Sequence, residues 1–169
     1  MKNIRSRKGV TIMEVVIALV IITAISAVSL SMIVISHDVE AKAESAITAK
    51  NAAENAVECY RFAKSYAQEL VTNPMEPIPI ADVFPQVFYT YLGKTGAYTA
   101  GTMVDDVFTS NQSGVAVDKN SVFRLVTNGC IITITQNFTD SNLNGFTFIA
   151  KDAKGEEIYS FNYPGGASQ

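Results

Sequence analysis

Glu14 is the residue whose type and position most clearly demand chemistry, because it is the only charged residue between Val10 and Ser36 in an otherwise apolar run. A group of basic residues precedes the run, with no acid among them: Lys2, Arg5, Arg7 and Lys8. An ionised carboxylate in apolar surroundings needs a cationic partner, or else it takes up a proton. The pattern therefore indicates a site where Glu14 is neutralised by a nearby cation.

Two cations could partner Glu14. In the intact chain, Arg7 and Lys8 lie within about two helical turns of it, which would make Glu14 a tolerated acid near the lipid headgroups. If the chain is cut after Gly9, Val10 acquires a free amine four residues before Glu14, on the same side of a helix. The helix dipole also favours an acid close to the first turn. The residues by themselves leave both interpretations open.

The apolar run is long enough to cross a membrane. Residues 10–36 would form about 40 Å of helix, whereas the hydrocarbon core of a bilayer is about 30 Å thick. The apolar part of a secretory signal peptide is shorter, about 7 to 15 residues. Basic residues stay on the cytoplasmic side, so residues 1–9 are predicted to be a cytoplasmic leader and the rest of the chain to lie outside. We interpret residues 10–36 as a transmembrane helix.

The charge of the remaining chain argues against several classes of function. All four leader bases precede Gly9, so residues 10–169 hold 9 Lys and Arg against 16 Asp and Glu, a net charge of −7. An acidic body is poorly suited to nucleic acid. The chain has one His and two Cys, without the spacing of a metal site, and it lacks a nucleophile elbow or a phosphate loop. We expect no cofactor, no metal and no enzymatic activity.

Helix-breaking residues are missing over a long stretch. No Gly or Pro occurs from Val10 to Asn73, which predicts one helix that ends before Pro74. Residues 37–73 would be its amphipathic continuation. Its apolar stripe is predicted to pack on a sheet and consists of Ala56, Cys59, Tyr60, Ala63, Tyr66, Ala67 and Leu70. Thr23, Ser26 and Ser29 recur every three residues, either as a close-packing face or as hydroxyls bonded back to their own helix.

Residues 74–169 are predicted to form a β-rich body outside the membrane. Four prolines between residues 73 and 85 suggest an extended connector, and residues 86–118 show no clear pattern. Strands are predicted at 122–127 and 130–138, joined by a type I′ turn at Asn128-Gly129 that pairs Thr127 with Cys130. Two further strands follow at 146–151 and 157–163. The expected fold class is α+β: a long N-terminal helix packed on an antiparallel sheet of about four strands.

The two cysteines fall on surfaces that should face each other. Cys59 lies on the helix stripe and Cys130 on the inward face of the hairpin. An outward location permits oxidation, so Cys59 and Cys130 are a candidate disulfide. The alternative is two buried thiols that pack as small apolar groups.

The start of the chain resembles a known family. Lys8-Gly9, Val10, Thr11, Ile12, Met13 and Glu14, followed by VVIALVII, resemble the N-terminal signature of type IV prepilins and type II secretion pseudopilins. These proteins have a short basic leader that ends in glycine, then a hydrophobic residue, Thr, two apolar residues and Glu. The resemblance is limited to the leader and the apolar run. It implies a pilin-like fold, in agreement with the strand pattern.

The resemblance implies a processing and assembly pathway. A prepilin peptidase of the inner membrane would cleave between Gly9 and Val10 and methylate the new amine. In assembly, the motif residues Thr11 and Glu14 would act at the helix start, and Glu14 would pair with the amine of a neighbouring subunit. The implied partners are the peptidase, other pilin subunits and an inner-membrane assembly platform. The precursor would reside in the cell membrane and the product in a surface filament or pseudopilus.

Two departures from the family pattern bear on the kind of subunit. The first mature residue would be Val10 where Phe or Met is common, and Ser31 stands where many major pilins carry proline. The EVVIALVII run, together with the absent proline, resembles minor, initiating subunits, so we favour a minor pilin over a major pilin, with a secretion pseudopilin as an open choice. The alternative functions are a single-pass membrane-anchored binding protein and a DNA-uptake competence pilin. The latter would need a basic patch that the acidic body does not obviously provide.

Overall fold

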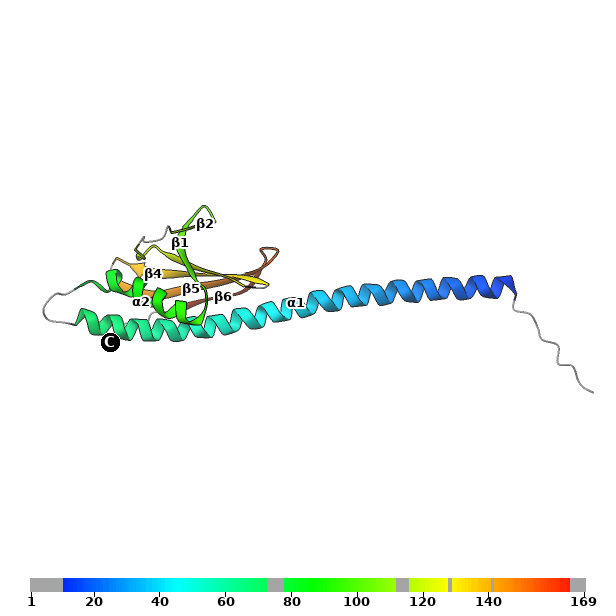
Figure 1. The fold of residues 1–169 in the computed structure, drawn as a ribbon, viewed down its shortest axis with the longest axis horizontal. Helices are drawn as coiled ribbons and strands as arrows, with labels where there is room; N and C mark the ends of the chain where they lie inside the picture. Colours follow the sequence, from blue (N-terminus) through cyan, green and yellow to red (C-terminus); the bar gives the residue numbers. More distant parts are fainter. Residues whose placement is uncertain (1–10, 73–77, 112–115, 128, 141, 165–169) are drawn as a thin grey trace, which may run out of the picture. The chain divides into compact units, whose positions relative to one another are not determined.

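The computed structural model describes residues 11–72, 78–111, 116–127, 129–140 and 142–164. Within these residues the chain forms two helices and six strands (Figure 1). The elements are α1 (Ile12–Val71), α2 (Ile80–Thr95), β1 (Thr99–Val104), β2 (Val107–Ser110), β3 (Val122–Thr127), β4 (Cys130–Thr139), β5 (Asn142–Asp152) and β6 (Glu157–Pro164). The chain divides into two compact units, Met1–Ala41 and Lys42–Gln169, and the second unit contains the sheet.

Helix α1 is a single element of 60 residues, which confirms the predicted long N-terminal helix. Its buried residues all lie in the C-terminal part and are mostly small: Ser45, Ala49, Ala52, Ala53, Ala56, Cys59, Tyr60, Ala63 and Ala67. The predicted stripe was wrong at two positions, because Tyr66 and Leu70 are 47% and 40% exposed. The alanines bring the helix backbone close to the body, and Tyr60 is the one large side chain of this buried face.

Helix α2 begins within the predicted connector and replaces its last part, whereas residues 73–77 of the connector lie outside the described residues. The prolines favoured an extended chain, but Pro79 lies at the N-terminal cap of α2 and Pro85 lies inside the helix. An internal proline removes one backbone hydrogen bond and disfavours a helix by about 3 kcal/mol. The helix nevertheless buries Ala81, Phe84, Phe88 and Leu92, which recur at three- or four-residue spacing. Burial of this apolar face outweighs the lost hydrogen bond.

The sheet has six antiparallel strands in the order β2-β1-β3-β4-β5-β6, so the prediction of about four was too low. The two extra strands, β1 and β2, come from the stretch that had no clear sequence pattern. They are joined through Asp105 and Asp106, whose φ angles of 47° and 62° are those of a type I′ turn. The register of β3 and β4 confirms the Asn-Gly hairpin, with Thr127 opposite Cys130.

Tyr60 marks the point where both helices meet the sheet. Its ring lies 5.3 Å from that of Phe84 on α2 and 5.4 Å from that of Phe146 on β5, measured between ring centroids. Residues of α1, α2 and the sheet form one hydrophobic core. The α+β class and the packing of the helix on the sheet are therefore as predicted, but with α2 as a second helix beside α1.

The β3–β4 turn contacts α1 through Ser45, whose hydroxyl donates a hydrogen bond to the carbonyl of Gly129 at 3.0 Å. Gly129 has a φ of +99°, which disfavours other residues. A Cβ atom at this position would lie 2.6 Å from Ser45 Oγ. Both the backbone angle and the contact with α1 therefore require glycine.

Gly129→Ala is expected to lower the free energy of unfolding of the body by about 1 to 3 kcal/mol, through backbone strain and the close contact with Ser45 Oγ. Urea unfolding of the full chain in detergent micelles would measure the loss. Adding Ser45→Ala removes the contacting oxygen and should restore part of the stability, while the backbone strain remains. An unchanged unfolding midpoint for Gly129→Ala would contradict the docking of this turn on α1.

Candidate functional site

Thr11 and Glu14 together form the start of α1. The backbone N–H of Glu14 donates to the carbonyl oxygen of Thr11 at 2.9 Å and lies 3.4 Å from its Oγ1, and the N–H of Val15 also donates to the Thr11 carbonyl. Thr11 thus occupies the N-cap position, with Glu14 at the third helical residue. This spacing is that of a capping box, a signal that sequence reasoning missed when it assigned Thr11 only to the prepilin-like motif.

The surroundings of Glu14 leave its charge partner undetermined. Its side chain is exposed, in the first turn of α1, where the helix dipole favours a negative charge. It forms no ion pair with any residue that the structure describes. The candidate processing residues Gly9 and Val10, and the bases Arg7 and Lys8, lie outside the described residues. The cap accounts for the position of Glu14 but does not neutralise its carboxylate.

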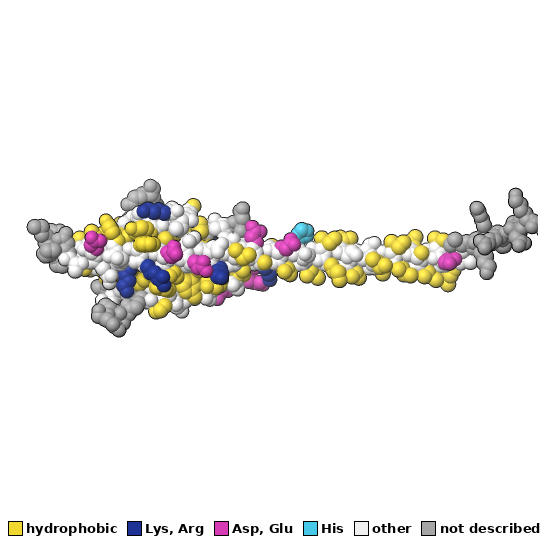
Figure 2. All heavy atoms as spheres, turned by 90° about the horizontal axis from the view of Figure 1, so that it is seen from below, with side chains coloured by type: hydrophobic (Ala, Val, Ile, Leu, Met, Phe, Trp, Pro, Cys, Tyr) yellow, Lys and Arg dark blue, Asp and Glu magenta, His cyan; other side chains and the backbone are white. Residues whose placement is uncertain are grey.

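The N-terminal part of α1 exposes apolar side chains on all sides. Large apolar residues from Ile12 to Val39 are exposed, and Figure 2 shows apolar side chains along this part of the helix. Among the described residues, α1 is the one helix long and apolar enough to cross a membrane. The charge-free stretch Val15 to Ser36 measures about 33 Å at about 1.5 Å per residue, against about 30 Å for a bilayer core. These features are compatible with membrane anchoring.

Four hydroxyl groups within this apolar stretch are bonded to their own helix. Thr23, Ser26, Ser29 and Ser31 donate to backbone carbonyls three or four residues earlier, at 2.8 to 3.0 Å. Such bonds allow a hydroxyl to lie in lipid without an unsatisfied donor. The bonds back to the helix that the sequence offered as one alternative for Thr23, Ser26 and Ser29 are therefore present. Their use as a close-packing face stays a prediction.

Cys59 and Cys130 are both buried and are free thiols in the structure. Burial raises the pKa of Cys59, and the nearby side chain of Thr95 partly offsets that increase. The sulfur of Cys130 lies 3.3 Å from Thr127 Oγ1. Burial also raises the pKa of Tyr98, and both cysteines add to that increase. Cys59 on α1 and Cys130 on β4 belong to the same hydrophobic core, and a disulfide between them stays a prediction.

Both thiols are expected to resist alkylation in the folded protein. Iodoacetamide reacts with the thiolate, and burial with a raised pKa disfavours that form of Cys59. Mass spectrometry of the full chain should show no label at pH 7.5 without denaturant. After denaturation, two free thiols would take two labels without a reductant, whereas the predicted disulfide would take them only after a reductant is added. Rapid labelling of the folded chain would contradict the burial of both residues.

The residues singled out from the sequence thus fall in two places. Thr11 and Glu14 lie at the start of α1, ahead of its exposed apolar surface, whereas Cys59 and Cys130 belong to the core of the second unit. Within the described residues, no three His, Cys, Asp or Glu side chains are grouped so that they could hold a metal ion. Comparison with protein-family models, curated proteins and solved structures finds no match to this chain.

Proposed function

We propose that this protein is a structural subunit of a type IV pilus or a related type II secretion pseudopilus. The observation that carries the proposal is the arrangement of residues at the head of α1. Lys8-Gly9 precede Val10, Thr11 caps the helix, and Glu14 is the only acid of the apolar run. The precursor would be anchored in the membrane and would polymerise through the apolar part of α1.

Charge neutralisation explains why this arrangement suits a polymer. Cleavage after Gly9 would leave the free amine of Val10 directly before the capping residue, Thr11. Glu14 lies in the first turn of the same helix, close to this amine. When apolar helices leave the bilayer and pack together, the acid of one subunit and the amine of the next can neutralise each other. A buried charge without such a partner is strongly unfavourable. Correct pairing would therefore control which neighbours assemble.

The apolar surface of α1 supplies the driving force for such an assembly. In the membrane, lipid covers these side chains, and in a filament the helices of neighbouring subunits would cover them instead. The body, residues 42–169, would then lie outside the helical core. The unbroken helix, with Ser31 in place of a proline, supports a minor, initiating subunit. Its partners would be a prepilin peptidase, other pilin subunits and an inner-membrane assembly platform.

Cleavage after Gly9 is the first test of this proposal. We expect the protein purified from its native membrane to begin at an N-methylated Val10, as read by N-terminal sequencing and intact mass. Replacing the glycine, as in Gly9→Val, should leave the leader attached, because a bulky residue precedes the scissile bond. A chain that retains Lys8 would contradict the proposal and favour the membrane-anchored binding protein. A chain that begins within residues 24–37 would also contradict the proposal, because cleavage there removes the apolar part of the helix.

A further inference from the structure

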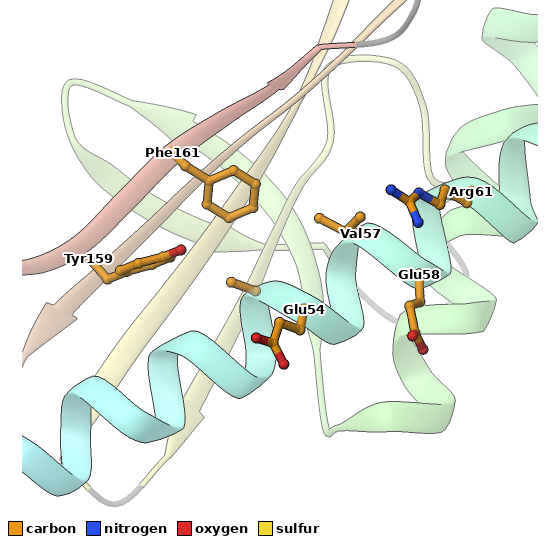
Figure 3. Close-up of a pocket in the computed structure, with 7 residues that line it drawn as sticks. Glu54, Val57, Glu58, Arg61, Tyr159 and Phe161 are labelled. Atoms are coloured by element: carbon orange, nitrogen blue, oxygen red, sulfur yellow. The ribbon is translucent and has the colours of Figure 1, made fainter.

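A groove runs between α1 and the last strand, β6, within the second unit. It has a volume of about 340 Å³ and is open to solvent. Its floor consists of Ala53, Val57, Tyr159 and Phe161. Figure 3 shows the rings of Tyr159 and Phe161 extending from β6 and the side chains of the rim extending from α1. The rim consists of Glu54, Glu58 and Arg61.

Strand β6 leaves one side of its backbone unpaired. It is the terminal strand of the sheet and pairs only with β5 among the described strands. Edge strands are usually protected by lysines, prolines or bulges within them. In β6 the register with β5 shifts at Ile158, near the start of the strand, and the proline is the last residue, Pro164. Between these two features the strand is regular and contains no lysine, so the stretch from Tyr159 to Tyr163 can accept another extended chain.

The rim of the groove is acidic on the side of α1. Glu58 forms no ion pair with any described residue, and Glu54 has only a long, exposed contact of 4.0 Å with Lys50. Exposed pairs of this kind contribute little. The guanidinium of Arg61 is engaged by Tyr163: its Nε donates to the Tyr163 hydroxyl at 3.1 Å, and the group lies over the ring of Tyr163. Acids beside aromatic rings favour a cationic side chain.

We propose that the groove and the free edge of β6 bind an extended segment of a different protein, which adds a strand to the sheet. A Lys or Arg of this segment would lie over Tyr159 and Phe161, close to Glu54 and Glu58. In this mode of recognition, backbone hydrogen bonds contribute affinity and the pocket for alternate side chains gives specificity. The proposal concerns the body alone and does not depend on filament assembly.

The charges of the chain disfavour a second copy as the occupant. The other free edge of the sheet is β2, whose sequence VFTS contains no base. The turn that leads into it contains Asp105 and Asp106, which would repel the acidic rim. A second copy that paired through β2 would thus bring the wrong charge to the groove. A basic, partly apolar segment of another protein fits both the charge and the floor.

Binding of a labelled peptide would test the proposal, with the full chain in detergent micelles. The probe is an acetylated and amidated peptide of sequence TVKVKVT, followed by fluorescence anisotropy, and the control peptide is TVEVEVT. We expect only the lysine peptide to bind. The double variant Glu54→Gln/Glu58→Gln should weaken its binding about tenfold. Both side chains are exposed, so the variant should unfold at the same temperature as the parent.

Two controls isolate the edge and the rim. N-methylation of alternate amides in the lysine peptide blocks strand addition and should abolish binding. Glu44→Gln/Glu69→Gln removes two exposed acids of α1 that do not line the groove, and it should leave binding unchanged. Equal binding of the lysine and glutamate peptides, or full binding of the methylated peptide, would overturn the proposal. So would a loss of self-association in Glu54→Gln/Glu58→Gln, because the occupant would then be a second copy.

Discussion

Glu14→Gln is expected to retain cleavage, membrane insertion and the start of α1, but to lower incorporation into filaments by about a hundredfold. Glutamine serves in a capping box as glutamate does, so the backbone hydrogen bonds of Glu14 and Val15 to Thr11 can be kept. It cannot neutralise the amine of a neighbouring subunit, and an unpartnered buried charge costs about 3 to 5 kcal/mol. The measurement is the amount of this subunit in sheared filaments, relative to the amount in the membrane.

Variants of the cap separate helix initiation from charge pairing. Thr11→Ala removes the capping oxygen and should weaken the helix start by about 1 kcal/mol, with the charge of Glu14 kept. We expect it to reduce incorporation far less than Glu14→Gln does. Glu14→Asp keeps the charge with a shorter side chain and should restore part of the incorporation. Normal incorporation of Glu14→Gln would refute the pairing role and leave Glu14 as a helix cap only.

Phe88→Ala is expected to lower the free energy of unfolding of the body by about 3 to 5 kcal/mol. Phe88 lies on α2 and is 0% exposed. Its ring centroid lies 5.3 to 6.0 Å from those of Tyr60, Phe84, Phe123 and Phe146. Removing the ring leaves a cavity where α1, α2 and the sheet meet. Urea unfolding of the full chain, followed by tyrosine fluorescence because the chain has no tryptophan, would measure the loss.

The matched control for Phe88 is another phenylalanine outside the core. Phe62 on α1 is 63% exposed, and its ring stacks on that of Tyr91 with 6.2 Å between centroids. Phe62→Ala should change the free energy of unfolding by less than about 1 kcal/mol. Equal effects of the two substitutions would mean that α2 does not complete the core. A loss below about 1 kcal/mol for Phe88→Ala would have the same meaning.

The sequence by itself determined the features that depend on local chemistry. The absence of Gly and Pro from Val10 to Asn73 predicted α1, because these are the residues that most often end a helix. The Asn-Gly pair predicted the β3–β4 register, because two residues with positive φ suit a type I′ turn. The sole acid of an apolar run identified Glu14 as a candidate site. Its charge partner is not a local property, so the proposed pairing awaits experiment.

Only the tertiary structure decided the features in which long-range burial competes with local preference. Pro85 locally disfavours a helix, yet α2 forms because Phe84, Phe88 and Leu92 complete the core. The strands β1 and β2 carry weak local signals and are stabilised by pairing with the rest of the sheet. The groove beside β6 joins residues about 100 positions apart in the sequence, such as Val57 and Phe161. Contacts between such distant residues leave no periodic pattern, so no reading of single segments could predict them.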